Sequence, residues 1–147
     1  MFASQTETRI QNLTSENIEA GAEIDFHLAL ELSDQIKSKQ LSVKDIVKAL
    51  GKRLVHSNPN VIILALKLAD SLLKNSGPSF ISDFDFYSVK SCILNSNNHV
   101  TTLARSLVAE WAVLFEQARG VFDECRRLGV VFPTAEGVVK ALAGILN

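Results

Sequence analysis

The amino-acid sequence predicts an all-helical domain of six to eight short helices without strands. Apolar residues recur at helical spacing in several segments, and the expected connections between these segments are only two to six residues long. One stretch, Phe80 to Tyr87, alternates in a strand-like way, but no partner strand pattern occurs elsewhere in the chain. Short connections make neighbouring helices antiparallel, so we expect a stack of helical hairpins.

The segment Asn58–Gly77, NPNVIILALKLADSLLKNSG, is the clearest helix. Asn58 is a good N-cap and Pro59 is preset for the first turn. Gly77 supplies the C-terminal stop, and Pro78 cannot continue the helix. Apolar residues occupy nearly every face between these ends. Such a helix is buried by neighbours on several sides, which makes it the central helix of the domain.

Three helices are expected before it. The first, over residues 3–14, is weakly amphipathic. The second, over about 25–38, has Asp25 as N-cap and an inward stripe of Leu28, Ala29, Leu32 and Ile36. In the third, Ser42 and Asp45 form an acidic capping box, and Gly51 suggests the close approach of another helix.

Later elements are less regular. We expect residues 80–87 to form a loop that leads into a helix over about 83–95. The next helix spans about 98–116, with its inward stripe made of Val100, Leu103, Leu107, Trp111 and Leu114. A helix over about 118–128 ends at Gly129, and residues 130–133 leave it in an extended form. Residues 134–147 are expected to be a tail, with a short helix as an option.

Composition excludes several classes of protein. Fifteen Lys and Arg residues stand against sixteen Asp and Glu residues, so no global field would attract nucleic acid. Cys92 and Cys125 are interpreted as buried hydrophobes in a reducing compartment, because they are far apart in helical patterns. No apolar run reaches the roughly 18 residues of a membrane span, and the N-terminus resembles no signal or transit peptide.

Nothing in the sequence indicates catalysis, a metal or another cofactor. Nucleophile-elbow, P-loop and dinucleotide-binding motifs are missing from it. Three histidines lie on separate segments near helix ends, where an exposed or capping role is expected. Asp83 and Asp85 are expected to cap the local chain. We therefore expect a binding module, not an enzyme.

Two surface features are not explained by a helical fold alone. Phe26 and Leu30 lie one turn apart, outside the inward stripe of the second helix, and would form a small apolar patch of the kind that binds a partner. The alternative is that the first helix or residues 17–24 cover them. A row of Lys44, Lys48 and Lys52 is interpreted as a solvated face, with contact to an acidic membrane surface as the alternative.

Four segments together resemble the VHS domain of the VHS/ENTH superfamily. They are the Asn58–Gly77 helix; Asp25-Phe26 with Leu30, Ser33 and Asp34; Val108-Ala109-Glu110-Trp111; and Leu128-Gly129-Val130-Val131-Phe132-Pro133. They occur in the family's order and cover about residues 8–133. The residues from Leu28 to Asp34 most resemble the ESCRT-zero subunits, of the vacuolar-sorting, Hrs and STAM type.

This resemblance implies a right-handed superhelix of about seven to eight helices, with a VHS-like domain at 1–133 and a tail at 134–147. It also implies a non-catalytic module that binds ubiquitin and ubiquitinated cargo, together with other endosomal sorting subunits. The expected location is cytoplasmic, peripheral on the endosome membrane. The aromatic residue and the leucine that contact ubiquitin in the family correspond to Phe26 and Leu30, and flanking contacts correspond to Asn60, Ile63 and Lys67. The family usually has Trp where this chain has Phe26.

Two other functions stay open at this point. One is a phosphoinositide-binding adaptor, as the ENTH relatives imply, which would use Lys44, Lys48 and Lys52. The other is a receptor for short sorting peptides of the dileucine type, which would use an apolar groove near Arg119, Arg126 and Arg127.

Overall fold

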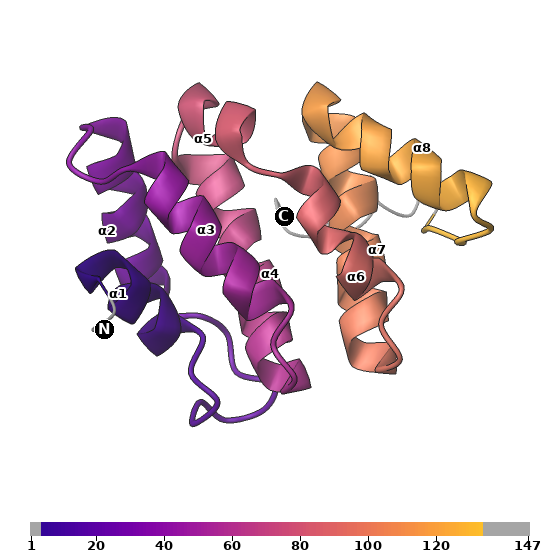
Figure 1. The fold of residues 1–147 in the computed structure, drawn as a ribbon, viewed down its shortest axis with the longest axis horizontal. Coiled ribbons are helices and arrows are strands. Elements are labelled where there is room, and N and C mark those ends of the chain that lie inside the picture. Colours follow the sequence, from indigo (N-terminus) through magenta and orange to yellow (C-terminus); the bar gives the residue numbers. More distant parts are fainter. Residues whose placement is uncertain (1–3, 134–147) are drawn as a thin grey trace, which may run out of the picture. The chain divides into compact units, whose positions relative to one another are not determined.

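The computed structural model describes residues 4–133, and in this range the chain is helical without strands (Figure 1). The α-helices are α1 (Gln5–Leu13), α2 (Phe26–Lys37), α3 (Val43–Leu54), α4 (Pro59–Asn75), α5 (Pro78–Asp83), α6 (Lys90–Ile93), α7 (Asn98–Leu114) and α8 (Arg119–Arg127). Short 3-10 helices span Phe86–Val89 and Glu116–Ala118. The predicted all-helical fold class is confirmed. The short helix suggested for 134–147 lies outside the described residues.

The chain divides into two compact units, Met1–Ser88 and Val89–Asn147, and each is described by itself. In the first unit α4 is central, because it contacts α1, α2, α3 and α5. Ten of its 17 residues are buried. The Asn58 side chain accepts a hydrogen bond from the backbone N–H of Asn60 at 2.9 Å, and Pro59 opens the first turn. The prediction of a capped, buried central helix is confirmed.

The residues after α4 depart from the prediction. Gly77 has a φ of 88°, a conformation that favours glycine, and Pro78 then opens α5 at once. Phe80, Phe84 and Phe86 are buried, and their ring centroids are 5.9 Å and 4.9 Å apart in sequence order. The expected loop at 80–87 is therefore wrong, because this aromatic cluster packs α5 and a 3-10 turn into the core. The helix expected over about 83–95 is present in shorter form, as the 3-10 turn Phe86–Val89 followed by α6.

The N-caps of α2 and α3 are the residues predicted from the sequence. Asp25 accepts from the backbone N–H of Leu28 at 3.2 Å, and Ser42 accepts from that of Asp45 at 3.4 Å. The interpretation of Gly51 is wrong, because a Cβ built there would meet no atom within 4 Å. Nothing in the structure requires a glycine at that position.

The second unit is built around α7, which contacts α6 and α8. Trp111 is fully buried, and Arg105 binds the carbonyl oxygen of Ile93 at 3.2 Å. Leu114 was expected in the inward stripe but is 47% exposed, because α7 ends there and Phe115 is extended. Gly129 has a φ of 92° directly after the end of α8, as its predicted role as a stop requires.

Candidate functional site

One edge of α2 carries the exposed apolar patch. Phe26 is 56% exposed and Leu30 is 45% exposed, so neither α1 nor residues 17–24 cover them. Their spacing of four residues places both side chains on the same edge. The Asp25 cap fixes the start of the helix immediately before Phe26. The predicted exposure of this pair is confirmed, and we call Phe26 and Leu30 the α2 patch.

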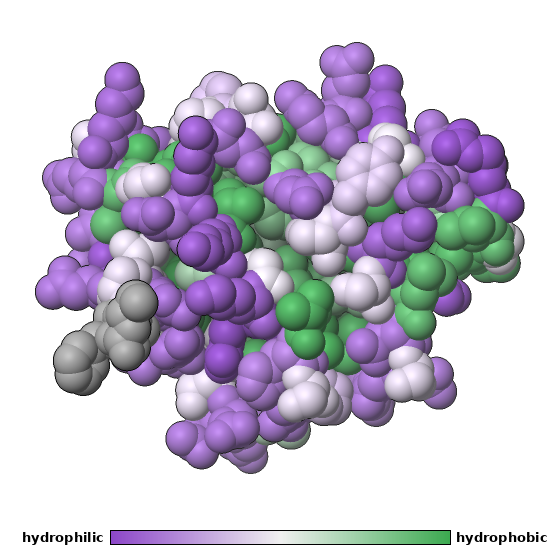
Figure 2. Space-filling view, in the orientation of Figure 1, coloured by the Kyte–Doolittle hydropathy of each residue, from purple (hydrophilic) through white to green (hydrophobic). Residues whose placement is uncertain are grey.

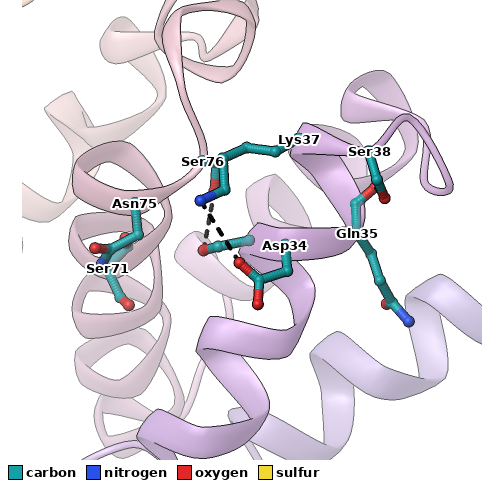
Figure 3. A network of polar contacts seen from close by, with 8 residues as sticks. Asp34, Gln35, Lys37, Ser38, Ser71, Asn75 and Ser76 are labelled. Atoms are coloured by element: carbon teal, nitrogen blue, oxygen red, sulfur yellow. Dashed lines mark hydrogen bonds and ion pairs between the residues drawn. The ribbon is translucent and has the colours of Figure 1, made fainter.

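The same edge continues into a buried contact between α2 and α4. Ser33 is buried, and its hydroxyl accepts a hydrogen bond from the Ser76 hydroxyl at 3.0 Å. One turn later Lys37 pairs with Asp34 at 3.5 Å, and Figure 3 shows this pair beside Ser76. The α2 patch is therefore bounded at its C-terminal side by a polar, fixed seam.

Lys67 of α4 fixes the other side of the patch. Its ammonium group donates to the carbonyl oxygen of Ala22 at 3.2 Å and to the Glu23 carboxylate at 3.1 Å. These residues directly precede the Asp25 cap, so Lys67 holds the segment that leads into α2. Its side chain is only 19% exposed. In this structure Lys67 therefore positions the patch, and the direct ubiquitin contact that the resemblance implies for it stays a prediction.

The two interhelical contacts also set the register between α2 and α4. Glu23 meets Lys67 and Ser33 meets Ser76, offsets of 44 and 43 residues, so the two helices run in the same direction. This register places Phe26 about level with Asp70, and Leu30 about level with Lys74. Asp70 and Lys74 pair with each other at 3.0 Å. Sequence reasoning missed them, because the register depends on contacts between residues far apart in the chain.

Asn60 and Ile63 lie farther along α4 from the level of the α2 patch than Asp70 and Lys74 do. Both are half-buried on α4. Asn60 precedes Lys67 by seven residues, about 10 Å along the helix axis, on the side away from Leu30. Their predicted ubiquitin contact is untested.

Leu28 is the one residue of α2 whose environment contradicts its predicted role. It was assigned to the inward stripe, but it is 43% exposed, whereas Ala29, Leu32 and Ile36 are buried. Its position on the helix is near the boundary of the buried stripe, and a cavity beside α1 leaves its side chain open. Helical periodicity cannot detect such a cavity.

The lysine row of α3 is exposed, as predicted, but acidic residues accompany it. Lys52 pairs with Glu7 of α1 at 3.1 Å, and Glu7 and Asp45 line one depression with Lys48 and Lys52. The neighbouring Arg53 is engaged with Thr14, whose hydroxyl lies 2.9 Å from its Nε. These contacts lower the positive charge available to an anionic surface. Membrane contact through Lys44, Lys48 and Lys52 stays a prediction.

The three arginines of the expected peptide groove do not share one depression in the second unit. Arg119 lines a small apolar hollow of about 230 Å³ with Ala112, Val113 and Phe122. Arg126 and Arg127 line a separate depression with Asp123. The guanidinium of Arg126 also lies 5.5 Å from the centre of the Phe122 ring. Asp123 lines both depressions. A peptide groove near these three arginines stays a prediction.

The two cysteines and His56 have structural surroundings. Burial raises the pKa of the Cys92 thiol to about 11, and it also raises the pKa of Cys125, so both stay protonated near neutral pH. His56 accepts a backbone hydrogen bond from Asn58 at 3.0 Å, in the capping role that was predicted. Residues 4–133 contain no cluster of three or more His, Cys, Asp or Glu side chains that could hold a metal. Nor does any helix in this range have the length and hydropathy to cross a bilayer.

Comparison with known proteins shows the family. The sequence profile of the VHS domain matches residues 1–128. The chain belongs to the VHS domain family. The predicted resemblance is thus confirmed over nearly the whole described range.

Two relatives that share one name refine this assignment. Vacuolar protein sorting-associated protein 27 from Yarrowia lipolytica is 32% identical over 139 residues, and that from Neurospora crassa is 38% identical over 149 residues. The alignments cover 86% and 91% of this chain but only 24% and 20% of those proteins. This VHS chain thus spans about a quarter or less of their length.

A solved structure is similar as well. The crystal structure of the VHS and FYVE tandem domains of Hrs, a protein involved in membrane trafficking and signal transduction, matches with a TM-score of 0.74 at 25% identity. The match covers 91% of this chain and 65% of that one. The helical arrangement predicted from the sequence is therefore that of a VHS domain.

Proposed function

We propose that this VHS domain is a non-catalytic ubiquitin-binding adaptor module in the endosomal sorting of ubiquitinated membrane cargo toward the vacuole or lysosome. The observation that carries the proposal is the exposure of Phe26 and Leu30 on one edge of α2. The similarity to vacuolar sorting proteins and to Hrs supports the trafficking context. In that context the domain would act in the cytoplasm, on the surface of endosomes, together with other sorting subunits.

The structure suits a weak and specific contact. An aromatic ring and a leucine one turn apart fit a flat apolar patch on a partner, and charged groups around them fix its orientation. Asp70 and Lys74 are level with the patch, and Lys67 holds the segment in front of it. The contact area is small, so a single domain would bind ubiquitin weakly. Useful avidity would require several ubiquitins or several binding modules.

An NMR titration of the isotope-labelled domain with mono-ubiquitin tests the proposal. We expect fast-exchange shifts centred on Phe26 and Leu30, extending to Asp70 and Lys74. Phe26→Ala and Leu30→Ala should each remove binding while the thermal melt stays near that of the parent. Leu94→Ala is a matched control, because Leu94 is 51% exposed and belongs to the other unit.

Two results would contradict the proposal. One is the absence of shifts at about 1 mM ubiquitin, because a contact with a Kd of about 1 mM would already be about half occupied at that concentration. The other is a footprint centred on α3 or α8. A footprint at Lys44, Lys48 and Lys52 that appears only with phosphoinositide vesicles would favour the lipid-binding alternative, and one at α8 with a dileucine peptide would favour the sorting-peptide alternative.

A further inference from the structure

The second unit has a small apolar hollow between α7 and α8, with a volume of about 230 Å³. We call it the α7–α8 hollow, and five apolar residues line it: Ala109, Ala112, Val113, Phe122 and Pro133. Arg119 and Asp123 also line it, and their charges cancel. Val113 is 52% exposed, so solvent reaches the apolar lining. The hollow therefore suits an apolar occupant and selects for no net charge.

The segment that follows α8 returns to this hollow. The backbone N–H of Val130 donates to the carbonyl oxygen of Cys125 at 3.0 Å, which turns the chain back along α8. The ring of Phe132 then packs on the ring of Phe122, with 4.7 Å between the centroids. Pro133 is part of the lining. The described chain therefore ends at the rim of the hollow, and residue 134 follows there.

The sequence after Pro133 has an apolar stripe at helical spacing. Residues 134–147 read TAEGVVKALAGILN. Their large aliphatic residues are Val138, Val139, Leu142, Ile145 and Leu146. On a helix that turns by about 100° per residue, these five fall on one stripe. Glu136, Lys140 and Asn147 fall on the other side, so the sequence suits a helix that covers one apolar surface.

Such a helix would need a surface to pack on. A helix of this length is marginal in water, and Gly137 and Gly144 each cost about 1 kcal/mol relative to alanine. Burial of the aliphatic stripe would have to offset these costs. The hollow is the first apolar surface available, because Pro133 lines it. Covalent attachment beside the hollow gives the segment an effective concentration on the order of millimolar, so even a weak contact would form.

We propose that residues 134–147 dock in the α7–α8 hollow as an amphipathic helix. The volume suits one or two side chains, and Val138 and Leu142, which are one turn apart, fit this size. Their methyl groups would replace water on Val113 and Phe122. While the segment is docked, the hollow is closed to other apolar ligands. The α2 patch belongs to the other unit, so this contact goes beyond the ubiquitin contact and does not depend on it.

NMR of the whole chain with labelled methyl groups tests the contact directly. We expect nuclear Overhauser effects from the methyl groups of Val138 and Leu142 to the ring of Phe122 and the methyl groups of Val113. A second sample mixes labelled and unlabelled chains and is filtered for effects between two chains. These same effects should be absent from the filtered spectrum, because the occupant is the chain's own segment and not a second copy.

Matched variants measure how much the hollow contributes. The readout is the slowing of amide hydrogen exchange over residues 139–146. Val113→Ser should reduce this protection about tenfold, because the hollow loses an apolar wall. Leu114→Ser is its control, since Leu114 is 47% exposed but does not line the hollow. Leu142→Ser should also reduce protection about tenfold, whereas Lys140→Ser on the polar side should change it less than about twofold.

Three results would overturn the proposal. They are the absence of Overhauser effects between the segment and the hollow, the appearance of these effects between two chains, and equal protection in Leu142→Ser and Lys140→Ser. The second result would identify a second copy of the chain as the occupant. Leu142→Ser alters neither α7 nor α8, so it stays informative if Val113→Ser unfolds. Ubiquitin takes part in none of these measurements, so this proposal and the proposed function can fail separately.

Discussion

The helices α2 and α4 lie side by side in the first unit, begin with similar caps and differ in what they bury. Ten of 17 residues are buried in α4, but only four of 12 in α2. Solvent reaches α2 on both edges, at Phe26 and Leu30 on one and at Leu28 on the other. Figure 2 shows polar side chains over most of the visible face and apolar side chains in patches. We infer that α4 mainly sets stability and that α2 mainly presents binding surfaces.

The largest effect should come from the centre of α4. Leu68 is fully buried, and Leu68→Ala should lower the free energy of unfolding by about 3 kcal/mol through lost burial and the cavity left behind. Leu30→Ala on α2 should cost less than about 1 kcal/mol, because Leu30 is already 45% exposed. Urea unfolding followed by circular dichroism measures both. Similar losses for the two variants would remove the contrast between the helices.

An intermediate effect is expected at the seam that joins them. Ser33→Ala leaves the Ser76 hydroxyl without its partner in a buried site, which should cost about 1–2 kcal/mol. Ser76→Ala should behave similarly. The double variant should be much closer to the parent than the sum of the two, because neither polar group then remains. Additive losses in the double-mutant cycle would show that the bond does not couple α2 to α4.

A smaller effect is expected at the cap of α2. Asp25→Ala should destabilise the domain by about 1 kcal/mol, because the backbone N–H of Leu28 loses its acceptor. Asp25→Asn should leave the thermal melt nearly unchanged, since asparagine caps as well as aspartate. If both variants melt like the parent, the cap does not hold the first turn that carries Phe26.

The sequence predicts α4 well because its signals are local. A cap, a proline, an apolar run and a terminal glycine all lie within Asn58–Gly77, and each acts on its own neighbours. Helical spacing left open whether α1 or residues 17–24 cover Phe26 and Leu30, but the position of these residues outside the buried stripe was predictable. The aromatic cluster after Pro78 was not, because the packing of Phe80, Phe84 and Phe86 overrides local preference.

The sequence did not predict the details of the site that depend on residues far apart in the chain. The tether from Lys67 to Ala22 joins positions 45 residues apart. The exposure of Leu28 depends on how α1 approaches α2. The position of Asp70 about level with Phe26 depends on the register between α2 and α4. Periodicity finds the buried face of one helix, but it carries no information about where a neighbouring helix stops.

The smallest effect concerns affinity alone. Phe26→Trp restores the residue that the VHS family usually has and enlarges the aromatic surface of the α2 patch. We expect ubiquitin to bind about two- to fourfold more tightly, a change of about 0.4–0.8 kcal/mol in binding free energy. Isothermal or NMR titration of the two proteins side by side measures it. Unchanged or weaker binding would show that the aromatic ring at this position does not contact ubiquitin.

The position of Trp111 makes the two units optically distinguishable. It is the single tryptophan of the chain, it is fully buried, and it belongs to Val89–Asn147. Its fluorescence therefore follows the unfolding of that unit, while far-ultraviolet circular dichroism follows the helices of both. Two melting curves that coincide would mean that the units unfold together, and curves that separate would assign each transition. Phe26→Trp would add a second emitter in the other unit, at the surface where a ligand quenches or shifts it.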